Sequence, residues 1–282
     1  MAVKVYNPLT PGLRHTSVIK NVGLTKNRPE KSLIIAKRGN AGRNNTGKIT
    51  VRHRGGGHKR FIRMVDFNQD KFGVVSKIAS LEYDPNRNTH LALLQYQDGE
   101  KRYIVAYHGA KVGDEVVSYK ELGNIKLGNR MPLKYIPTGT EVYNIELTPG
   151  GGGKLGRSAG NAATFMALDG GKAQLKMPSG ELRLVQENCA ATIGTPGNIE
   201  HRNIRWGKAG RMRHRGWRPS VRGKAMNPVD HPHGGGEARN PIGLKHPKTY
   251  TGKIALGVKT RKSKKYSNRS IIKRRKNRNL NS

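Results

Sequence analysis

The stretch VVSKIASLEYDPNRNTHLALLQYQDGEKRYIVA, residues Val74–Ala106, decides the fold of this chain. It contains three runs that are rich in β-branched and aromatic residues, which favour strands. A DPN turn at residues 84–86 separates the first two runs, and a DG pair at residues 98–99 separates the last two. Asp-Gly between two such runs is the strongest short-range signal of a β-hairpin. The stretch therefore predicts consecutive short strands rather than helices.

The same pattern extends over residues 61–119, where five strand runs are expected. They are Phe61–Phe67, Val74–Tyr83, Leu91–Gln97, Tyr103–Ala106 and Glu115–Tyr119. Five short strands in so few residues suit a small barrel, of which the oligonucleotide-binding type is one common solution.

The pattern restarts after Gly128 and predicts a second small barrel, with a linker near Ile125–Asn129. Its expected strands are Glu141–Leu147, Ala162–Leu168, Ala173–Met177, Leu182–Gln186 and Ala190–Ile193. Helical periodicity of useful length is absent from both regions. We therefore expect a mainly β fold with two small barrels in tandem.

The charge of the chain is concentrated at its two ends. The 282 residues include 54 Lys and Arg against 18 Asp and Glu, a formal net charge of +36. Residues 1–60 carry +13 and residues 201–282 carry +22, whereas residues 61–200 carry only +1. This split predicts a near-neutral body with long, irregular, basic extensions at both ends. The expected segments are 1–60, 61–126, 127–200 and 201–282.

So large a positive charge favours a polyanionic partner, and the pattern favours nucleic acid over a membrane. No apolar run approaches the roughly 18–20 residues that span a bilayer, and the first residues lack the apolar core of a secretory signal. The single cysteine, Cys189, excludes an internal disulfide framework and a multi-cysteine zinc site. Its apolar neighbours predict a buried, inert thiol.

Residues 37–59, KRGNAGRNNTGKITVRHRGGGHK, set basic side chains among Gly and Asn. The glycine triplet Gly55–Gly57 can bring backbone amides close to phosphates while the flanking cations neutralise them. A solvated linker is the alternative, but linkers are seldom so rich in arginine. The expected RNA contacts here are Arg43, Arg52, His53, Arg54, His58, Lys59 and Arg60.

Residues 202–222 place both tryptophans of the protein among arginines, a combination suited to base stacking and phosphate binding. A helix whose tryptophans pack on the body is the alternative. The expected contacts are Arg202, Arg205, Trp206, Lys208, Arg211, Arg213, Arg215, Trp217, Arg218 and Arg222. The tail from Lys245 has 14 basic residues and no acidic one, and Arg261, Arg274 and Arg275 are expected contacts within it. A nuclear-targeting signal is the other standard interpretation of such a run.

The segment Arg222–Pro241, RGKAMNPVDHPHGGGEARNP, is too rich in Pro and Gly for regular structure, so a partner is expected to shape it. In an extended segment His231 and His233 point the same way, and with Asp230 or Glu237 they can hold a metal. One of them can also act as a general base. Because no rigid element fixes this geometry, we expect neither role and predict that both histidines face RNA.

Gly151, Gly153 and Gly156 match the spacing of a dinucleotide-binding loop. That loop needs a buried strand before it and a long helix after it. Pro149 interrupts the approach and Gly160 interrupts the only candidate helix, so the match is taken as chance. The neighbouring Gly-Lys pair also lacks the Ser or Thr of a phosphate-binding P-loop.

Four strings carry a resemblance to a known family: RHRGGGHKR at residues 52–60, LEYDPNR at 81–87, RSAG at 157–160 and RGKAMNPVDHPHGGGEARN at 222–240. Together they resemble the family of the bacterial-type second protein of the large ribosomal subunit, over essentially the whole chain. Small departures surround the longest string, at Lys224, at Ala238 and in the segment 241–244.

The resemblance implies an oligonucleotide-binding-type barrel followed by an SH3-like barrel, with extensions that penetrate large-subunit ribosomal RNA (rRNA). It implies a primary rRNA binder that supports subunit association, tRNA binding and the peptidyl transferase centre, to which His231 is nearest. Other implied contacts are Arg157, Asn227, His233 and Arg239. The implied partners are large-subunit rRNA, small-subunit rRNA at an intersubunit bridge and neighbouring ribosomal proteins. No enzyme activity, cofactor, metal, membrane or homo-oligomer is expected, and a bacterial cytoplasm is favoured over an organelle.

Overall fold

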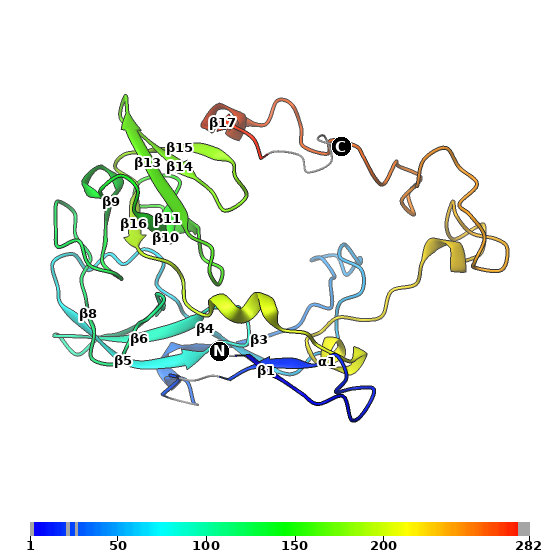
Figure 1. Cartoon of the computed structure of the whole chain (residues 1–282), viewed down its shortest axis with the longest axis horizontal. Helices are drawn as coiled ribbons and strands as arrows, with labels where there is room; N and C mark the ends of the chain where they lie inside the picture. The colour runs from blue at the N-terminus through cyan, green and yellow to red at the C-terminus, as the bar shows by residue number, and fades with distance from the viewer. Residues whose placement is uncertain (1–2, 21–22, 26–27, 276–282) are drawn as a thin grey trace. The chain divides into compact units, whose positions relative to one another are not determined.

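A computed structural model describes residues 3–20, 23–25 and 28–275 and is mainly β (Figure 1). The chain divides into two compact units. The first, here called the barrel unit, comprises Met1–Arg38, Lys59–Lys208 and Arg269–Ser282. The second, here called the cationic unit, comprises Gly39–His58 and Ala209–Asn268. None of the described helices is long and apolar enough to cross a membrane.

The opening stretch of the sequence forms a four-stranded antiparallel sheet with the order β7-β6-β5-β8. Its strands are β5 (Ser76–Tyr83), β6 (His90–Tyr96), β7 (Lys101–Val105) and β8 (Glu115–Val116). The predicted hairpin at the DG pair is confirmed, because β6 pairs with β7 and Gly99 takes a φ of +83°. Glycine reaches this left-handed region at no steric cost.

Strand β6 is buried on both faces, which explains why its sequence shows no polar alternation. Ala92 and Leu94 belong to the main core of this sheet, while Leu91 and Leu93 form a second cluster with Tyr103. Leu33, from the N-terminal segment, packs against that second cluster.

The N-terminal segment thus contributes structure to the barrel unit. It contains β1 (Val3–Val5), β2 (Ser17–Ile19), a 3-10 turn η1 (Lys31–Leu33) and β3 (Ile34–Lys37). Strand β1 pairs with β2, and β3 pairs with β4 (Arg60–Arg63). The backbone N–H of Glu30 also donates to the Tyr103 hydroxyl at 2.8 Å. The division of the chain at residue 60 stays a prediction.

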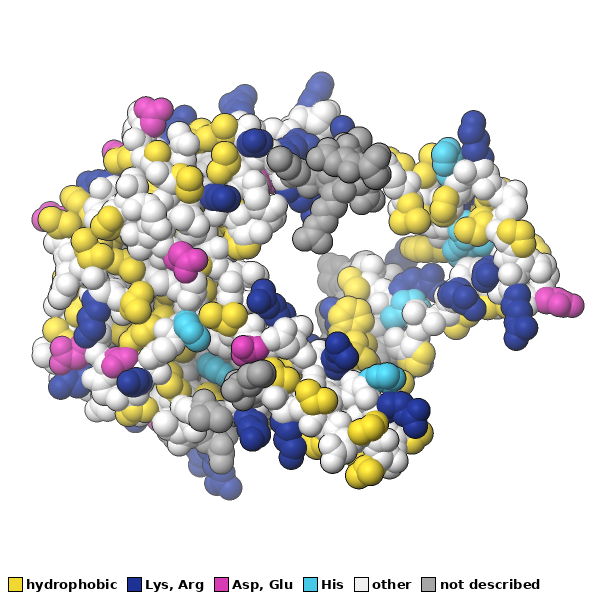
Figure 2. Space-filling view, viewed as in Figure 1, with side chains coloured by type: hydrophobic (Ala, Val, Ile, Leu, Met, Phe, Trp, Pro, Cys, Tyr) yellow, Lys and Arg dark blue, Asp and Glu magenta, His cyan; other side chains and the backbone are white. Residues whose placement is uncertain are grey.

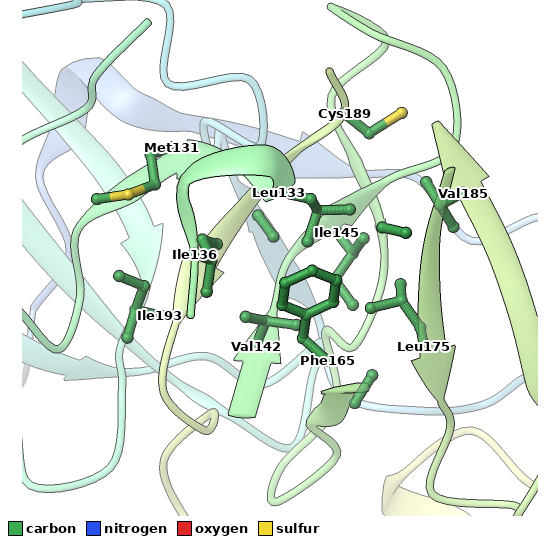
Figure 3. Close-up of a cluster of buried hydrophobic side chains, with 13 residues drawn as sticks. Met131, Leu133, Ile136, Val142, Ile145, Phe165, Leu175, Val185, Cys189 and Ile193 are labelled. Atoms are coloured by element: carbon green, nitrogen blue, oxygen red, sulfur yellow. The ribbon is translucent and has the colours of Figure 1, made fainter. Parts of the chain in front are cut away.

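The second sheet has seven strands in the order β17-β15-β14-β13-β10-β16-β9. These are β9 (Arg130–Pro132), β10 (Glu141–Tyr143), β13 (Ala163–Asp169), β14 (Lys172–Lys176), β15 (Leu182–Gln186), β16 (Ala190–Ile193) and β17 (Ile271–Lys273). Figure 3 shows the Phe165 ring in the middle of its core, near Ile145 and Leu175. The predicted fold class, mainly β with tandem small barrels, is confirmed.

Local details differ from the strand predictions. The run Glu141–Leu147 is not one strand, because Asn144 takes a φ of +49° and divides it into β10 and β11 (Ile145–Glu146). Strand β11 pairs with β12 (Gly153–Leu155), which the sequence did not predict. A Cβ at Gly153 would overlap the Asn144 side chain, so this glycine serves backbone packing and not dinucleotide binding.

The remaining regular elements are short. The barrel unit contains the 3-10 turns η2 (Leu133–Tyr135) and η3 (Ile199–Asn203). The cationic unit contains α1 (Ala209–His214) and η4 (Gly223–Ala225), and η5 (Tyr266–Ser270) crosses the boundary between the units.

Cys189 lies in the core of the second sheet with no exposed surface, as its neighbours predicted. Burial raises the pKa of its thiol to about 11. The thiolate is the reactive form of cysteine, so this side chain is unreactive at neutral pH.

A buried ion pair links three strands of the second barrel. Arg130 Nη2 lies 2.9 Å from Glu146 Oε1, and the two side chains are only 1% and 3% exposed. The other carboxylate oxygen of Glu146 accepts the backbone N–H groups of Gly150 at 3.0 Å and Ala190 at 3.1 Å. The Arg130 guanidinium also donates to the Asn144 carbonyl at 2.7 Å. The pair therefore fixes the ends of β9, β11 and β16 against each other.

Replacing Arg130 by Met is expected to lower the free energy of unfolding by about 3–5 kcal/mol, because it leaves the Glu146 carboxylate buried and unpaired. Urea unfolding of the full chain, followed by circular dichroism, measures this change. Lys77→Met is the matched control: its pair with Glu115, at 3.6 Å, is 67% and 53% exposed, so the expected loss is below about 1 kcal/mol. Equal losses in the two variants would contradict the structural role of the buried pair.

Candidate nucleic-acid interface

The cationic unit carries its charge without an apolar core. Its 80 residues include 19 basic and 2 acidic side chains, whereas the rest of the chain has 35 and 16. Among its described residues there is no β-strand, and none belongs to a buried apolar cluster. Figure 2 shows dark blue Lys and Arg and cyan His on the part of the chain that follows α1, and dark blue side chains also lie over the barrel unit. Such a unit suits a polyanionic partner.

Two segments that are far apart in the sequence pair within this unit. The N–H groups of Gly55 and His58 donate to the carbonyls of Gly216 and His214, each at 3.0 Å. In return the Arg218 N–H donates to the His53 carbonyl, also at 3.0 Å. The basic stretches on either side of the barrel sequences therefore form one structure.

Side-chain stacking supports this pairing. The Arg54 guanidinium lies over the Trp217 ring, 3.7 Å from its centroid, a favourable cation–π geometry. The His58 and His214 rings meet edge to face, with their centroids 4.7 Å apart. Trp217 remains 41% exposed, which leaves indole surface on which a base can stack.

The glycines Gly55–Gly57 are needed for the pairing of the two segments, apart from the predicted approach to phosphates. A Cβ on Gly57 would lie 2.8 Å from the backbone nitrogen of Gly216, closer than side-chain atoms tolerate. The Gly55 amide is already used in the pairing. Contact of the triplet with phosphate stays a prediction.

A cavity of about 440 Å³ beside the paired segments is strongly cationic. Arg43, Arg52, Arg54 and Arg218 line it together with His53, and no carboxylate does. Guanidinium groups bind phosphate through two parallel hydrogen bonds, so this concentration of arginine suits an RNA backbone.

The two histidines of the Arg222–Pro241 segment support its backbone. His231 Nδ1 accepts the N–H of His233 at 3.0 Å, and His233 Nε2 accepts the N–H of Lys248 at 2.8 Å. Each accepting nitrogen must be unprotonated, so each ring has only its other nitrogen free for RNA. Among the described residues no group of three metal-binding side chains assembles. An RNA-facing role for either ring stays a prediction.

Glycines and backbone hydrogen bonds fix the rest of this segment. The Asn227 carbonyl accepts from the N–H groups of Asp230 at 3.0 Å and His231 at 3.3 Å, and Gly235 donates to Met226 at 3.0 Å. A Cβ on Gly234 would overlap the Asn227 carbonyl. The segment that was expected to take its shape from a partner thus has internal contacts that define a shape.

The structure divides the predicted RNA contacts between the units and buries none of them. The cationic unit holds Arg43, Arg52, His53, Arg54, His58, Arg211, Arg213, Arg215, Trp217, Arg218, Arg222, Asn227, His231, His233, Arg239 and Arg261. The barrel unit holds Lys59, Arg60, Arg157, Arg202, Arg205, Trp206, Lys208, Arg274 and Arg275.

Several of these residues also have partners within the protein. In the barrel unit, Arg157 lies over the Phe67 ring at 4.4 Å, and Thr16 forms a β-bridge with Trp206. In the cationic unit, Arg261 donates to Ser267 at 2.9 Å and to Asn268 at 2.8 Å. Intramolecular contact and the predicted RNA contact are compatible, because all of these side chains keep exposed surface.

The barrel unit neutralises its own carboxylates. Around the β6–β7 hairpin, Arg102 donates to Asp66 at 2.8 Å and to Glu100 at 2.6 Å, and it also contacts Asp70. The hydrogen bond from Arg102 lowers the pKa of Asp70, and the hydrogen bonds from Arg102 and Lys71 lower that of Glu100. These acidic groups are therefore ionised and paired at neutral pH, in contrast to the uncompensated charge of the cationic unit.

Tyr250 was not among the predicted RNA contacts, yet it lies beside one of them. The Arg52 guanidinium is 5.0 Å from its ring centroid, and Tyr250 lines a second cavity of the cationic unit. The only feature of the sequence that could have indicated Tyr250 is that it is an aromatic residue in a basic segment.

Two small β-barrels and a separate arginine-rich unit without an apolar core define an RNA-binding scaffold protein. Comparison with protein families specifies it further. Residues 30–118 match the family model "Ribosomal Proteins L2, RNA binding N-terminal domain", and residues 126–252 match "Ribosomal Proteins L2, C-terminal domain". The chain belongs to the ribosomal protein L2 family and is a structural RNA-binding protein of the large ribosomal subunit.

Replacing Gly57 by Ala is expected to separate the paired segments, because the added methyl group meets the Gly216 backbone. Hydrogen exchange at the Gly55 and His58 amides should accelerate about tenfold or more, equivalent to about 1.4 kcal/mol. Gly39→Ala is the matched control, since a Cβ there meets nothing within 4 Å. Unchanged exchange in Gly57→Ala would show that the segments do not pair as described.

Proposed function

We propose that the protein is a primary binder of large-subunit rRNA, with the cationic unit following the RNA backbone and the barrel unit forming a rigid platform. The observation that carries this proposal is a high density of positive charge in a unit without an apolar core. Nineteen cations lie in a unit with two carboxylates and, among its described residues, no apolar cluster. Phosphates supply the neutralisation that this unit lacks.

Within the subunit, the proposed roles are support of subunit association, of tRNA binding and of the peptidyl transferase centre. The proposed partners are large-subunit rRNA, small-subunit rRNA at an intersubunit bridge and neighbouring ribosomal proteins. The loop around His231 is held by its own backbone hydrogen bonds. A loop with a defined shape is compatible with the proposed role of supporting the RNA of that centre. A bacterial cytoplasm is the proposed location.

Peptide-bond formation is, in this proposal, chemistry of the RNA. The main rival is an enzyme that uses His231 and His233 directly as base or metal ligand. The hydrogen bonds at His231 Nδ1 and His233 Nε2 weigh against that rival. A ring nitrogen that accepts a backbone N–H leaves the proton of the neutral imidazole on the other nitrogen, which is then neither a base nor a metal ligand. Turnover or stoichiometric metal in the purified, RNA-free protein would favour it.

A protein that compacts DNA is the second rival, since charge alone permits it. Such a protein would bind duplex DNA as tightly as rRNA at equal salt. The internally paired carboxylates and the buried apolar clusters of the barrel unit weigh against it, because a general compactor has no need of a rigid platform.

Replacing His231 by Ala is expected to lower the peptidyl transferase rate of fully assembled large subunits by about tenfold. The change removes an acceptor and a ring from the loop, a loss of about 1.4 kcal/mol in positioning. The rate of a model reaction between aminoacylated substrates on purified subunits measures it.

Two further variants show whether the loss of rate is specific to His231 and whether it comes from the internal hydrogen bond. His246→Ala changes an exposed histidine of the same unit and should leave the rate unchanged. His231→Asn keeps an acceptor near the Nδ1 position, so recovery there identifies the internal hydrogen bond as the cause. Full activity of assembled His231→Ala subunits would remove His231 from any functional role.

A further inference from the structure

A cavity of about 700 Å³ opens in the cationic unit beside the loop that contains the histidines. Its size lies within the ~300–1,000 Å³ range of ligand pockets. Ile49 and Met226 supply apolar lining, Tyr250 and Arg52 supply an aromatic ring and a guanidinium, and Asn227 and Asp230 supply polar groups. Apolar and aromatic side chains beside a few polar groups are found in many small-molecule sites.

The walls suit a nucleobase. Tyr250 is 58% exposed and Ile49 is 56% exposed, so neither is covered by the protein's own core. The Arg52 guanidinium lies 5.0 Å from the Tyr250 ring centroid. Unpaired RNA bases bind proteins by stacking on tyrosine rings and arginine planes.

Asp230 narrows the choice of base. It is one of two acidic residues in residues 201–282, and among the described residues its carboxylate has no hydrogen bond or ion pair. A carboxylate that faces RNA is repelled by phosphates unless a donor group meets it. Guanine offers two adjacent donors on its Watson–Crick edge, N1–H and N2–H, which match the two oxygens of a carboxylate. Adenine, cytosine and uracil present no such pair of neighbouring donors.

Asn227 completes the match, because its side-chain amide can donate to the O6 atom of guanine while Asp230 accepts from N1–H and N2–H. Both residues lie on one turn, which is closed by the hydrogen bond from the Asp230 N–H to the Asn227 carbonyl at 3.0 Å. The N–H of Lys248 donates to His233 Nε2 at 2.8 Å. Because Tyr250 is only two residues beyond Lys248, this hydrogen bond connects the segment of Asn227 and Asp230 to the segment that carries Tyr250. These hydrogen bonds therefore connect the two residues that would recognise the base edge, Asn227 and Asp230, with the ring of Tyr250 on which the base would stack.

We propose that this cavity binds an unpaired guanine of the rRNA, with Asp230 and Asn227 reading its Watson–Crick edge and Tyr250 and Arg52 stacking on its ring. The proposal rests on the proposed rRNA-binding function and adds base selectivity to it.

Chemical probing of assembled large subunits tests the proposal. A dicarbonyl reagent that adds across N1 and N2 of unpaired guanine should find a guanine protected by the wild-type protein and about tenfold more reactive with Asp230→Asn, since each bidentate base contact is worth about tenfold or more. Glu237→Gln removes the same charge from a residue that does not line the cavity, and it should leave that guanine protected. A pattern of guanine reactivity that is unchanged in Asp230→Asn would overturn the proposal.

Binding of the free full chain to a labelled uridine oligomer of about a dozen nucleotides gives an independent measurement. One central guanosine should tighten binding about tenfold over adenosine, and inosine, which lacks N2–H, should fall between them. Asp230→Asn should abolish this preference while tightening binding to the guanine-free oligomer, because a negative charge is lost. A preference that vanishes with a chelator would mean that Asp230 holds a divalent cation instead, and would overturn guanine recognition. Failure of every oligomer to bind would count against the proposed function itself, whereas binding without preference would count only against this site.

Discussion

The cationic unit depends on one constraint: its positive charges repel one another, and no buried apolar cluster among its described residues opposes that repulsion. Its stabilising contacts are backbone hydrogen bonds between residues 53–58 and 214–218, the stack of Arg54 on Trp217, and close glycine contacts. Each such contact contributes only about 0.5–1.5 kcal/mol. In the proposed function phosphates supply the missing stabilisation, so we expect RNA binding to stabilise the fold of this unit.

The barrel unit, in contrast, is stabilised by contacts within the protein. It contains ion pairs on the surface around Arg102 and in the interior between Arg130 and Glu146. The carboxylate of Glu82 is buried but accepts from the Tyr103 hydroxyl at 2.7 Å and from Ser80 at 3.0 Å. These hydrogen-bonded groups and the apolar clusters on both faces of β6 stabilise this unit without a partner. The chain thus combines a unit that has its own apolar clusters with a unit that has a high density of positive charge and no such cluster among its described residues.

Local patterns in the sequence predicted the strands well where a strand is bounded by turn residues. Strands β5, β6 and β7 and the glycine turn at residue 99 follow directly from composition and spacing. Contacts between distant segments were not predictable, because no periodicity encodes them. The pairing of His58 with His214 joins residues 156 positions apart, and β17 in the basic tail completes the sheet at β15. In the candidate site none of the predicted RNA contacts is buried, and their contact with RNA stays a prediction. Their protein partners, such as Lys248 for His233, depend on the fold and could not be predicted.

The histidine loop shows why glycine and histidine recur in a segment that contacts RNA. A loop that is disordered before binding loses conformational entropy when it binds, and this loss weakens affinity. Here the imidazole rings accept backbone N–H groups, Gly234 allows the chain to approach Asn227, and prolines restrict the unfolded chain. Each feature moves part of the ordering cost from the binding step to the folding of the loop. Histidine serves this purpose well because one ring nitrogen can accept from the protein while the other remains available to a nucleotide. The same residue can then be a structural support of the loop and a contact for RNA, without any chemistry of its own.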